Sequence, residues 1–195
     1  MDLVHFQPAS HPMTSNMKTI LQSIRIVIVL TLMTGVIYPL TVTMIARVIF
    51  PYQADGSLIK DGDKIAGSAL LAQKFEDARY FLPRPSGADY ATVASGASNK
   101  GPTSADLLKA IEERRKALGD GVPVDLLTAS GSGLDPHISP EAARFQVIRI
   151  EQARKLQPGR LNALVDQLIE PPQFGVLGEP RVNVLSLNRA LDRLH

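Results

Sequence analysis

The hydrophobic residues of the chain are concentrated in one long run near the N-terminus. Residues 26–46 are all uncharged and are mainly Ile, Val, Leu, Met and Thr, with Arg25 and Arg47 at the two ends. As a helix the run would measure about 31 Å, which matches the roughly 30 Å hydrocarbon core of a bilayer. It is longer than the apolar region of a signal peptide, and residues 47–51 contain no small-residue cleavage site. We therefore expect a permanent transmembrane anchor over residues 18–50.

Two residues inside this run bear on how the anchor is used. Pro39 has no backbone N–H and so favours a kink, and Gly35 lies one turn before it. Membrane helices tolerate Gly and Pro in general, but a glycine also lets a second helix approach closely. The pattern leaves both interpretations open. Gly35 and Pro39 are the candidate positions for packing against other membrane helices.

Beyond the anchor, apolar periodicity predicts three helices. The first begins near Ser104 and ends at Gly119. The second opens at Ser139, where a serine N-cap is followed by Pro140, and it runs to about residue 156. The third, over residues 161–168, has its leucines and a valine on one stripe.

The remaining patterns add short strands and a flexible end. Residues 182–187 alternate partly like a strand, and Asn188 could cap a short terminal helix. Residues 58–59 and 122–127 are candidate strands or core segments. Residues 1–17 contain two prolines and no periodicity, so we expect a disordered tail. The predicted architecture is one membrane helix followed by a single small α+β domain over residues 51–195.

Composition and charge exclude several classes of function. The 195 residues contain no cysteine, which excludes disulfides, zinc–thiolate sites, iron–sulfur clusters and thiol catalysis. A net charge of +2 without a basic tract, and an aromatic content of 5%, give no support to nucleic-acid binding. Four histidines without metal-site spacing make a metal centre a poor candidate, so we expect no metal site.

Two polar segments carry the information about function. Residues 80–104 are rich in Gly, Pro, Ser and Asn and show no helix or strand pattern, which is typical of a functional or mobile loop. Residues 128–137 are a second such segment, directly before the helix capped by Ser139. Neither matches a nucleotide motif, because Pro136 replaces the third dinucleotide glycine and Pro102 replaces the P-loop lysine.

The second segment also contains the residue types of a hydrolase triad. Ser130 or Ser132 could serve as the nucleophile with His137 and Asp135. The glycine spacing of a nucleophile elbow is missing, however. We favour the simpler interpretation, in which Asp135 makes a turn with Pro136 and His137 hydrogen-bonds the loop. From the residues alone, the chain is a membrane-anchored module without a recognisable catalyst.

These segments resemble a known family, the C subunit of the bacterial Kdp potassium pump. The most specific matches are SGASNKGP at residues 95–102 and VPVDLLTASGSGLDPHISP at residues 122–140. Ala97 departs from the expected pattern, in which a second glycine follows Gly96. Shorter matches complete the resemblance from about residue 20 to the end of the chain, at residues 55–59, 67–70, 84–86 and 178–185.

The resemblance implies an accessory subunit of a complex that uses ATP to carry potassium into the cell. In that complex a channel-like subunit moves K+, and a P-type ATPase subunit binds ATP and Mg. The C subunit would have no cofactor of its own and would not be an enzyme. It would be needed for assembly and activity, and as a catalytic chaperone it would raise the ATP affinity of the ATPase subunit. This chain lacks the Asp-Lys-Thr-Gly phosphorylation motif of an ATPase subunit.

The same resemblance implies a location and a set of contacts. The chain would cross the bacterial inner membrane once, with a cytoplasmic N-terminus and a periplasmic domain; the count of basic residues does not decide this orientation. The two polar segments are the expected interface with the other subunits. The candidate interface residues are Arg84, Ser86, Ser98, Asn99, Gly131, Asp135 and His137. The alternatives are a membrane-tethered periplasmic serine hydrolase and a freestanding solute-binding domain.

Overall fold

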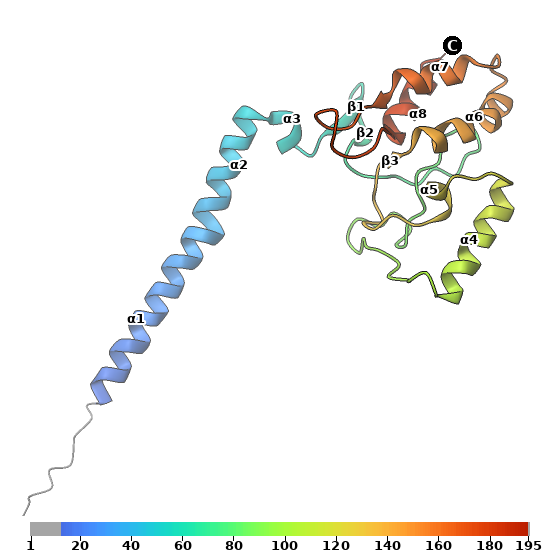
Figure 1. Cartoon of the computed structure of the whole chain (residues 1–195). Helices are drawn as coiled ribbons and strands as arrows, with labels where there is room; N and C mark the ends of the chain where they lie inside the picture. The colour runs from blue at the N-terminus through green and yellow to red at the C-terminus, as the bar shows by residue number, and fades with distance from the viewer. Residues whose placement is uncertain (1–12, 195) are drawn as a thin grey trace, which may run out of the picture. The chain divides into compact units, whose positions relative to one another are not determined.

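The computed structural model describes residues 13–194, which form two compact units divided after Asp55. The first unit is helical: α1 (Met13–Leu32), a π-helical turn η1 (Met33–Ile37), α2 (Tyr38–Ile49) and the short α3 (Pro51–Ala54) (Figure 1). Asn16–Ile49 is long and apolar enough to cross a membrane, with a mean hydropathy of 2.1 in its most apolar window. The helix thus includes residues 13–17, which we had assigned to the tail; residues 1–12 lie outside the described part.

The π-helical turn contains Gly35 and ends just before Pro39. The Tyr38 N–H donates to the carbonyl of Met33, five residues back, and Pro39 follows in the first turn of α2. Proline cannot donate a helix hydrogen bond, and a π-bulge is one of the known ways to absorb that defect. At this point the long helix has a widened π-helical turn.

Two small antiparallel sheets belong to the second unit. β1 (Leu58–Asp61) and β2 (Lys64–Ser68) form a hairpin with a register shift after Ile59. The other sheet has the order β3-β5-β4, from β3 (His137–Ile138), β4 (Ile169–Glu170) and β5 (Arg181–Asn183). His137 pairs with Asn183, and Glu170 pairs with Arg181. These short strands with the helices make an α+β domain, as the sequence predicts.

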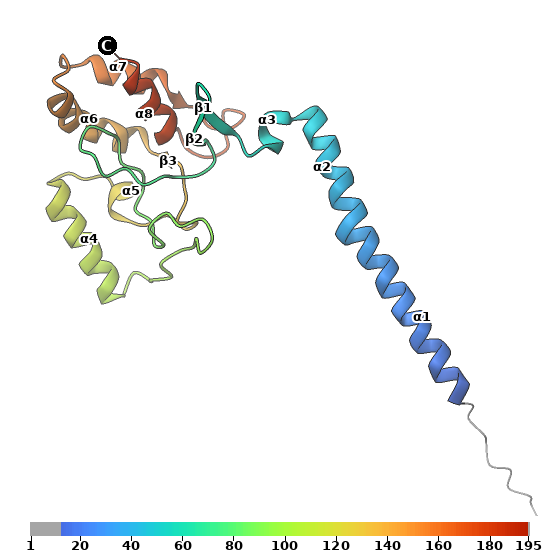
Figure 2. The ribbon, with the colours of Figure 1, turned by 180° about the vertical axis from the view of Figure 1, so that it is seen from behind.

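The three helices predicted by periodicity are present. α4 (Ala105–Leu118) is capped by the Ser104 hydroxyl and ends at Gly119, and α6 (Pro140–Arg154) is capped by Ser139. α7 (Arg160–Gln167) follows. α5 (Val124–Leu127) is a single helical turn within residues 122–127, for which the sequence predicts a strand or a core segment. In Figures 1 and 2, α4 stands apart from α6, α7 and α8, which gather around the three-stranded sheet.

The prediction for residues 182–188 was wrong in its boundaries. Only Arg181–Asn183 is a strand, and α8 (Val184–Asp192) begins at once, with the Asn183 side chain accepting from the Ser186 N–H at 3.0 Å. The helix cap is therefore Asn183 and not Asn188, which is buried in the middle of α8. The alternation of apolar residues over so short a run fits the buried face of a helix equally well.

The hydrophobic core is formed by α6, α7, α8 and the three-stranded sheet, together with Phe81 from the irregular segment. Phe81, Ile150, Leu161 and Leu187 are fully buried. No helix or strand covers residues 69–104, yet Phe81 within this segment is part of the core. The domain thus packs around an irregular segment, whose backbone needs hydrogen-bond partners from the helices.

Polar side chains of α6 and α8 hold this segment. The Asn188 amide accepts from the Phe81 N–H at 2.8 Å and donates to the Phe81 carbonyl at 3.0 Å. Gln146 makes the same pair of bonds with Leu82, at 2.7 and 3.1 Å. Arg149 donates to the carbonyls of Ala78 and Tyr80. These side chains take the place of a neighbouring strand, so the buried backbone keeps its hydrogen bonds.

Candidate functional site

The two polar segments meet at a pair of glycines. Gly133 is buried with φ +71°, and a Cβ at this position would lie 2.8 Å from the carbonyl oxygen of Gly96. The same Cβ would lie 3.4 Å from the Ser86 hydroxyl. A second tie is the Ser130 N–H, which donates to the carbonyl of Pro85 at 3.0 Å. We call this junction of residues 84–98 and 128–139 the loop junction.

Four charged side chains and the His137 imidazole form a row that crosses the loop junction and continues into the three-stranded sheet; we call this row of Arg84, Asp135, His137, Glu170 and Arg181 the charged chain. Arg84 Nη1 lies 3.3 Å from Asp135 Oδ2, and His137 Nδ1 lies 3.6 Å from Asp135 Oδ1. On its other side, His137 Nε2 lies 3.8 Å from Glu170 Oε2. Arg181 Nε donates to the same Glu170 oxygen at 3.0 Å. The chain brings together three residues predicted for the site, Arg84, Asp135 and His137.

Asp135 is the centre of this charged chain. The His137 imidazole holds the pKa of the Asp135 carboxyl below its ordinary value, and the His137 backbone N–H, at 3.0 Å, and Arg84 act in the same direction. Partial burial opposes them. Asp135 therefore stays ionised and makes the turn before Pro136 that the sequence predicts. Arg84 Nε is buried and has no hydrogen-bond partner within residues 13–194.

Ser86 organises the turn that follows Arg84. Its hydroxyl accepts from the N–H groups of Ala88 and Tyr90, at 3.2 and 2.9 Å. The Tyr90 hydroxyl donates back to the Arg84 carbonyl at 2.9 Å, and burial raises the pKa of Tyr90. Asp89 and Tyr90 both adopt positive φ, at 49° and 61°, which non-glycine residues rarely do. The turn is therefore held in one conformation rather than left free.

The other predicted residues lie at the edges of the loop junction. Ser98 lines a cavity of about 300 Å³ with Ser86, Lys100 and Arg114. Asn99 is exposed at φ 53°, and Gly131 is exposed with open space around it. The structure thus groups Ser86 and Ser98 at one cavity, whereas no contact within residues 13–194 explains Asn99 and Gly131.

The geometry does not favour a serine hydrolase. Ser130 is buried, and the Ser132 hydroxyl accepts from the Leu134 N–H at 3.1 Å. The hydrogen bonds of the described residues join neither serine to His137, whose imidazole faces Asp135 and Glu170 instead. Within residues 13–194 there is also no group of three His, Asp or Glu side chains arranged to hold a metal ion.

The sequence analysis missed Glu170 and Arg181, which extend the charged chain. They face each other across β4 and β5, and strands of two and three residues are too short to give an alternation pattern. The buried amides of Gln146 and Asn188 were missed for a related reason: their partners are backbone groups far away in the sequence.

Comparison with known proteins identifies the family. A family model described as "K+-transporting ATPase, c chain" matches residues 20–193. The chain is 50% identical to the potassium-transporting ATPase KdpC subunit of Geobacter metallireducens, over 91% of this chain and 99% of that protein. It is 54% identical to the KdpC subunit of Rhodospirillum rubrum, over 84% and 89% of the two chains. The chain therefore belongs to the KdpC family, the c chains of K+-transporting ATPases.

Proposed function

We propose that the chain is the non-catalytic accessory subunit of an ATP-driven potassium import complex. The observation that carries this proposal is the match to the family over residues 20–193, supported by curated relatives at about 50% identity. The charged groups of the loop junction pair with one another. This arrangement suits a rigid surface that binds a partner better than it suits a catalytic site. The partners would be the channel-like subunit, which moves K+, and the P-type ATPase subunit, which binds ATP and Mg.

The helical unit would be the membrane anchor, with the N-terminus in the cytoplasm and the domain in the periplasm. The resemblance to the family implies this orientation, which the basic residues flanking the apolar helix do not decide. The widened turn near Gly35 and Pro39 would be a surface for the membrane helices of the partners. In this arrangement the loop junction docks on the channel-like subunit.

A periplasmic domain cannot touch cytoplasmic ATP. We propose that the chain raises the ATP affinity of the ATPase subunit through the membrane subunits, as a coupling free energy between separate sites. The effect would then require the assembled complex. The apparent KM for ATP of the complex should rise when the chain is absent or when its docking is weakened.

The test is co-purification in mild detergent of the tagged chain from potassium-starved cells, with K+-stimulated ATP hydrolysis as the readout. We expect two larger membrane subunits to elute with the chain and to carry that activity. Arg84→Ala should lower the complex yield or change the K+ dependence. Arg144→Ala should not, because Arg144 makes an exposed ion pair with Asp166, at 2.8 Å, away from the loop junction. A wild-type chain that elutes alone from cells expressing the partners would contradict the proposal.

A further inference from the structure

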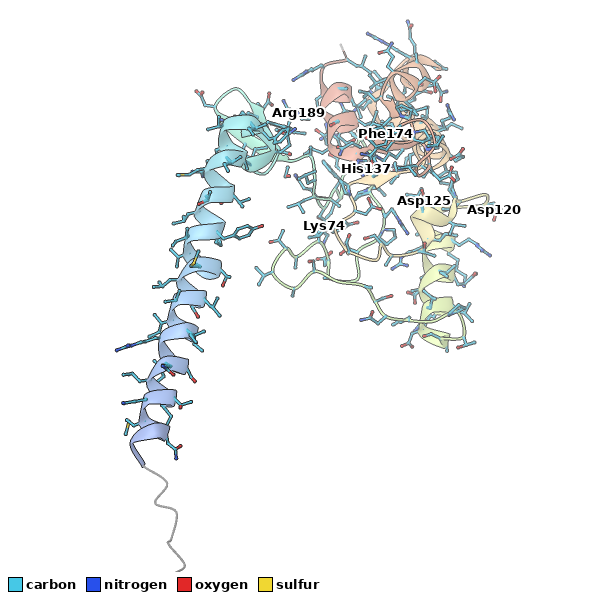
Figure 3. The ribbon with its side chains drawn as sticks, turned by 60° about the vertical axis from the view of Figure 1, so that its left-hand side comes forward. Lys74, Asp120, Asp125, His137, Phe174 and Arg189 are labelled. Atoms are coloured by element: carbon cyan, nitrogen blue, oxygen red, sulfur yellow. The ribbon has the colours of Figure 1, made fainter. Side chains whose placement is uncertain are left out.

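The connection between β4 and β5 exposes three large apolar side chains on one tight turn. Phe174 is 84% exposed, Val176 81% and Leu177 59%. Single exposed apolar residues are ordinary on protein surfaces, but three within four residues form a patch that marks an interaction site. We call residues 173–178 the apolar turn; Figure 3 labels Phe174 and His137.

The apolar turn is held in one shape by its own backbone. The Gln173 N–H donates to the Leu177 carbonyl at 2.9 Å, and the Leu177 N–H donates back to the Gln173 carbonyl at 3.0 Å. The Gly175 N–H donates to Pro172 at 2.9 Å. Such a preformed turn loses little conformational entropy when it binds, which is the usual advantage of a rigid anchor.

Phe174 is strained in this turn. Its φ is 55°, in the left-handed region that glycine and asparagine occupy easily and that a phenylalanine rarely adopts. The side chain buries little in return within the domain, since it is 84% exposed. A large aromatic residue that is strained and yet exposed in its own domain indicates that its side chain is buried against another molecule.

The composition of the turn distinguishes between a lipid and a protein partner. Residues 171–180 contain no Lys, Arg, Trp or Tyr, and the one charged residue among them is Glu179. Loops and helices that enter a bilayer interface usually carry basic residues for the anionic lipids and aromatic residues with a polar edge. The neighbouring Arg181 is already engaged by Glu170, at 3.0 Å. The chemistry therefore favours an uncharged, concave protein surface.

The apolar turn is also continuous with the loop junction. β4 and β5, which carry it, end in the Glu170–Arg181 pair, and Glu170 lies 3.8 Å from His137. From there the charged chain runs through Asp135 to Arg84. Protein interfaces combine an apolar anchor with a polar surround of this kind.

We propose that Phe174, with Val176 and Leu177, is the apolar anchor of the subunit interface and inserts into an apolar pocket of the channel-like subunit. This inference rests on the proposed function, because it places the anchor in the interface that the loop junction begins. The charged chain then forms the polar part of the same contact surface, beside the anchor.

Phe174→Asn tests the anchor without threatening the fold, since asparagine tolerates the left-handed conformation that strains phenylalanine. We expect the full-length chain to keep its thermal unfolding midpoint, while its association with the partner subunits weakens by about tenfold or more, as for a central anchor residue. The matched control is Ile148→Asn, which removes an isolated apolar side chain that is 67% exposed on α6. Unchanged association of Phe174→Asn, with a complex that still depends on Arg84, would overturn the anchor and leave the proposed function standing.

A photo-crosslinking benzophenone side chain at position 174 identifies the occupant in the assembled complex. Crosslinks to the channel-like subunit, absent when the same group stands at position 148, support the proposal, and crosslinks to the ATPase subunit alone would overturn it. Crosslinks to lipid alone would overturn it in favour of a membrane contact. If the wild-type chain assembles with no subunit at all, both the anchor and the proposed function are wrong.

Discussion

Asp135 receives contacts from Arg84 on one side and from His137 on the other. Its pKa is lowered in the folded chain, chiefly by the His137 imidazole, so the folded state prefers the ionised carboxylate. The stability that this preference contributes is fully present above the unfolded pKa. It is lost as the pH falls from about 5 through the ordinary value of 3.8 to the lower folded value.

Asp135→Asn should therefore lower the free energy of unfolding at neutral pH by about 1 kcal/mol, a value reduced for the partial exposure of the pair. The difference from wild type should begin to shrink as the pH falls below about 5, and it should close only as the pH falls through the lowered pKa of the folded Asp135. Urea unfolding of the purified chain in detergent, repeated between pH 7 and pH 3, measures this. A difference that stays constant over the whole range would mean that the carboxylate charge is not what stabilises the loop junction.

Gly133 is the residue at which the two polar segments come closest. In Gly133→Ala the new methyl group would lie 2.8 Å from the Gly96 carbonyl, and alanine at φ +71° is itself strained. We expect a loss of roughly 1–3 kcal/mol in the free energy of unfolding, with looser pairing of the segments. Gly131→Ala is the matched control, because open space surrounds that glycine and its φ is not positive. Equal stability of the two variants, measured by urea unfolding, would contradict the close approach.

At the scale of elements, the irregular segment depends on side chains of α6 and α8 in place of a strand partner. Asn188→Leu keeps a similar volume but leaves both the N–H and the carbonyl of the buried Phe81 without their bonds. We expect the free energy of unfolding to fall by roughly 2–4 kcal/mol, the combined effect of two unpaired buried groups. Amide hydrogen exchange at Phe81 should accelerate. Asn162→Leu, at an exposed position of α7, is the control and should change neither measurement by much.

The same elements show which structural features a local sequence pattern can predict. Ser104 and Ser139 were recognised as helix caps because a cap and its helix are adjacent in sequence, and the structure confirms both. Asn188 was misassigned as a cap because its partner, Phe81, is 107 positions away, so no local pattern reveals it. The one available signal was the position of Asn188 on the apolar face of a helix. A buried amide needs a hydrogen-bond partner, so such a position indicates that a partner lies nearby in the fold.

The candidate site, like the helices, could be predicted from the sequence only where the signal is local. The polar segments and the trio of Arg84, Asp135 and His137 were found from composition and resemblance, and the structure brings the three together. Glu170 and Arg181 could not be found in this way, because the strand pairing that places Glu170 near His137 joins distant residues through two short strands. Strand register is a tertiary property, and strands this short leave little trace of it in the sequence.

At the scale of the whole molecule, the orientation of the apolar helix decides which side of the membrane the domain faces. The basic residues that flank the apolar helix fall on both sides, so charge alone does not orient it. The chain contains no cysteine, however, so a single introduced cysteine is the only thiol that a reagent can find. Val93 is fully exposed in the irregular segment of the domain, and Asn16 is exposed near the start of the long helix.

With the N-terminus in the cytoplasm, a membrane-impermeant maleimide should label Val93→Cys in spheroplasts and should label Asn16→Cys only after lysis. The reason is that the apolar helix separates the two positions by a bilayer that the charged reagent cannot cross. The wild-type chain, which has no thiol, gives the background, and labelling of both variants after lysis shows that each thiol is reactive. The reverse pattern would place the domain in the cytoplasm. The loop junction and the apolar turn would then face the cytoplasm, and direct contact with the ATPase domains would replace coupling through the membrane.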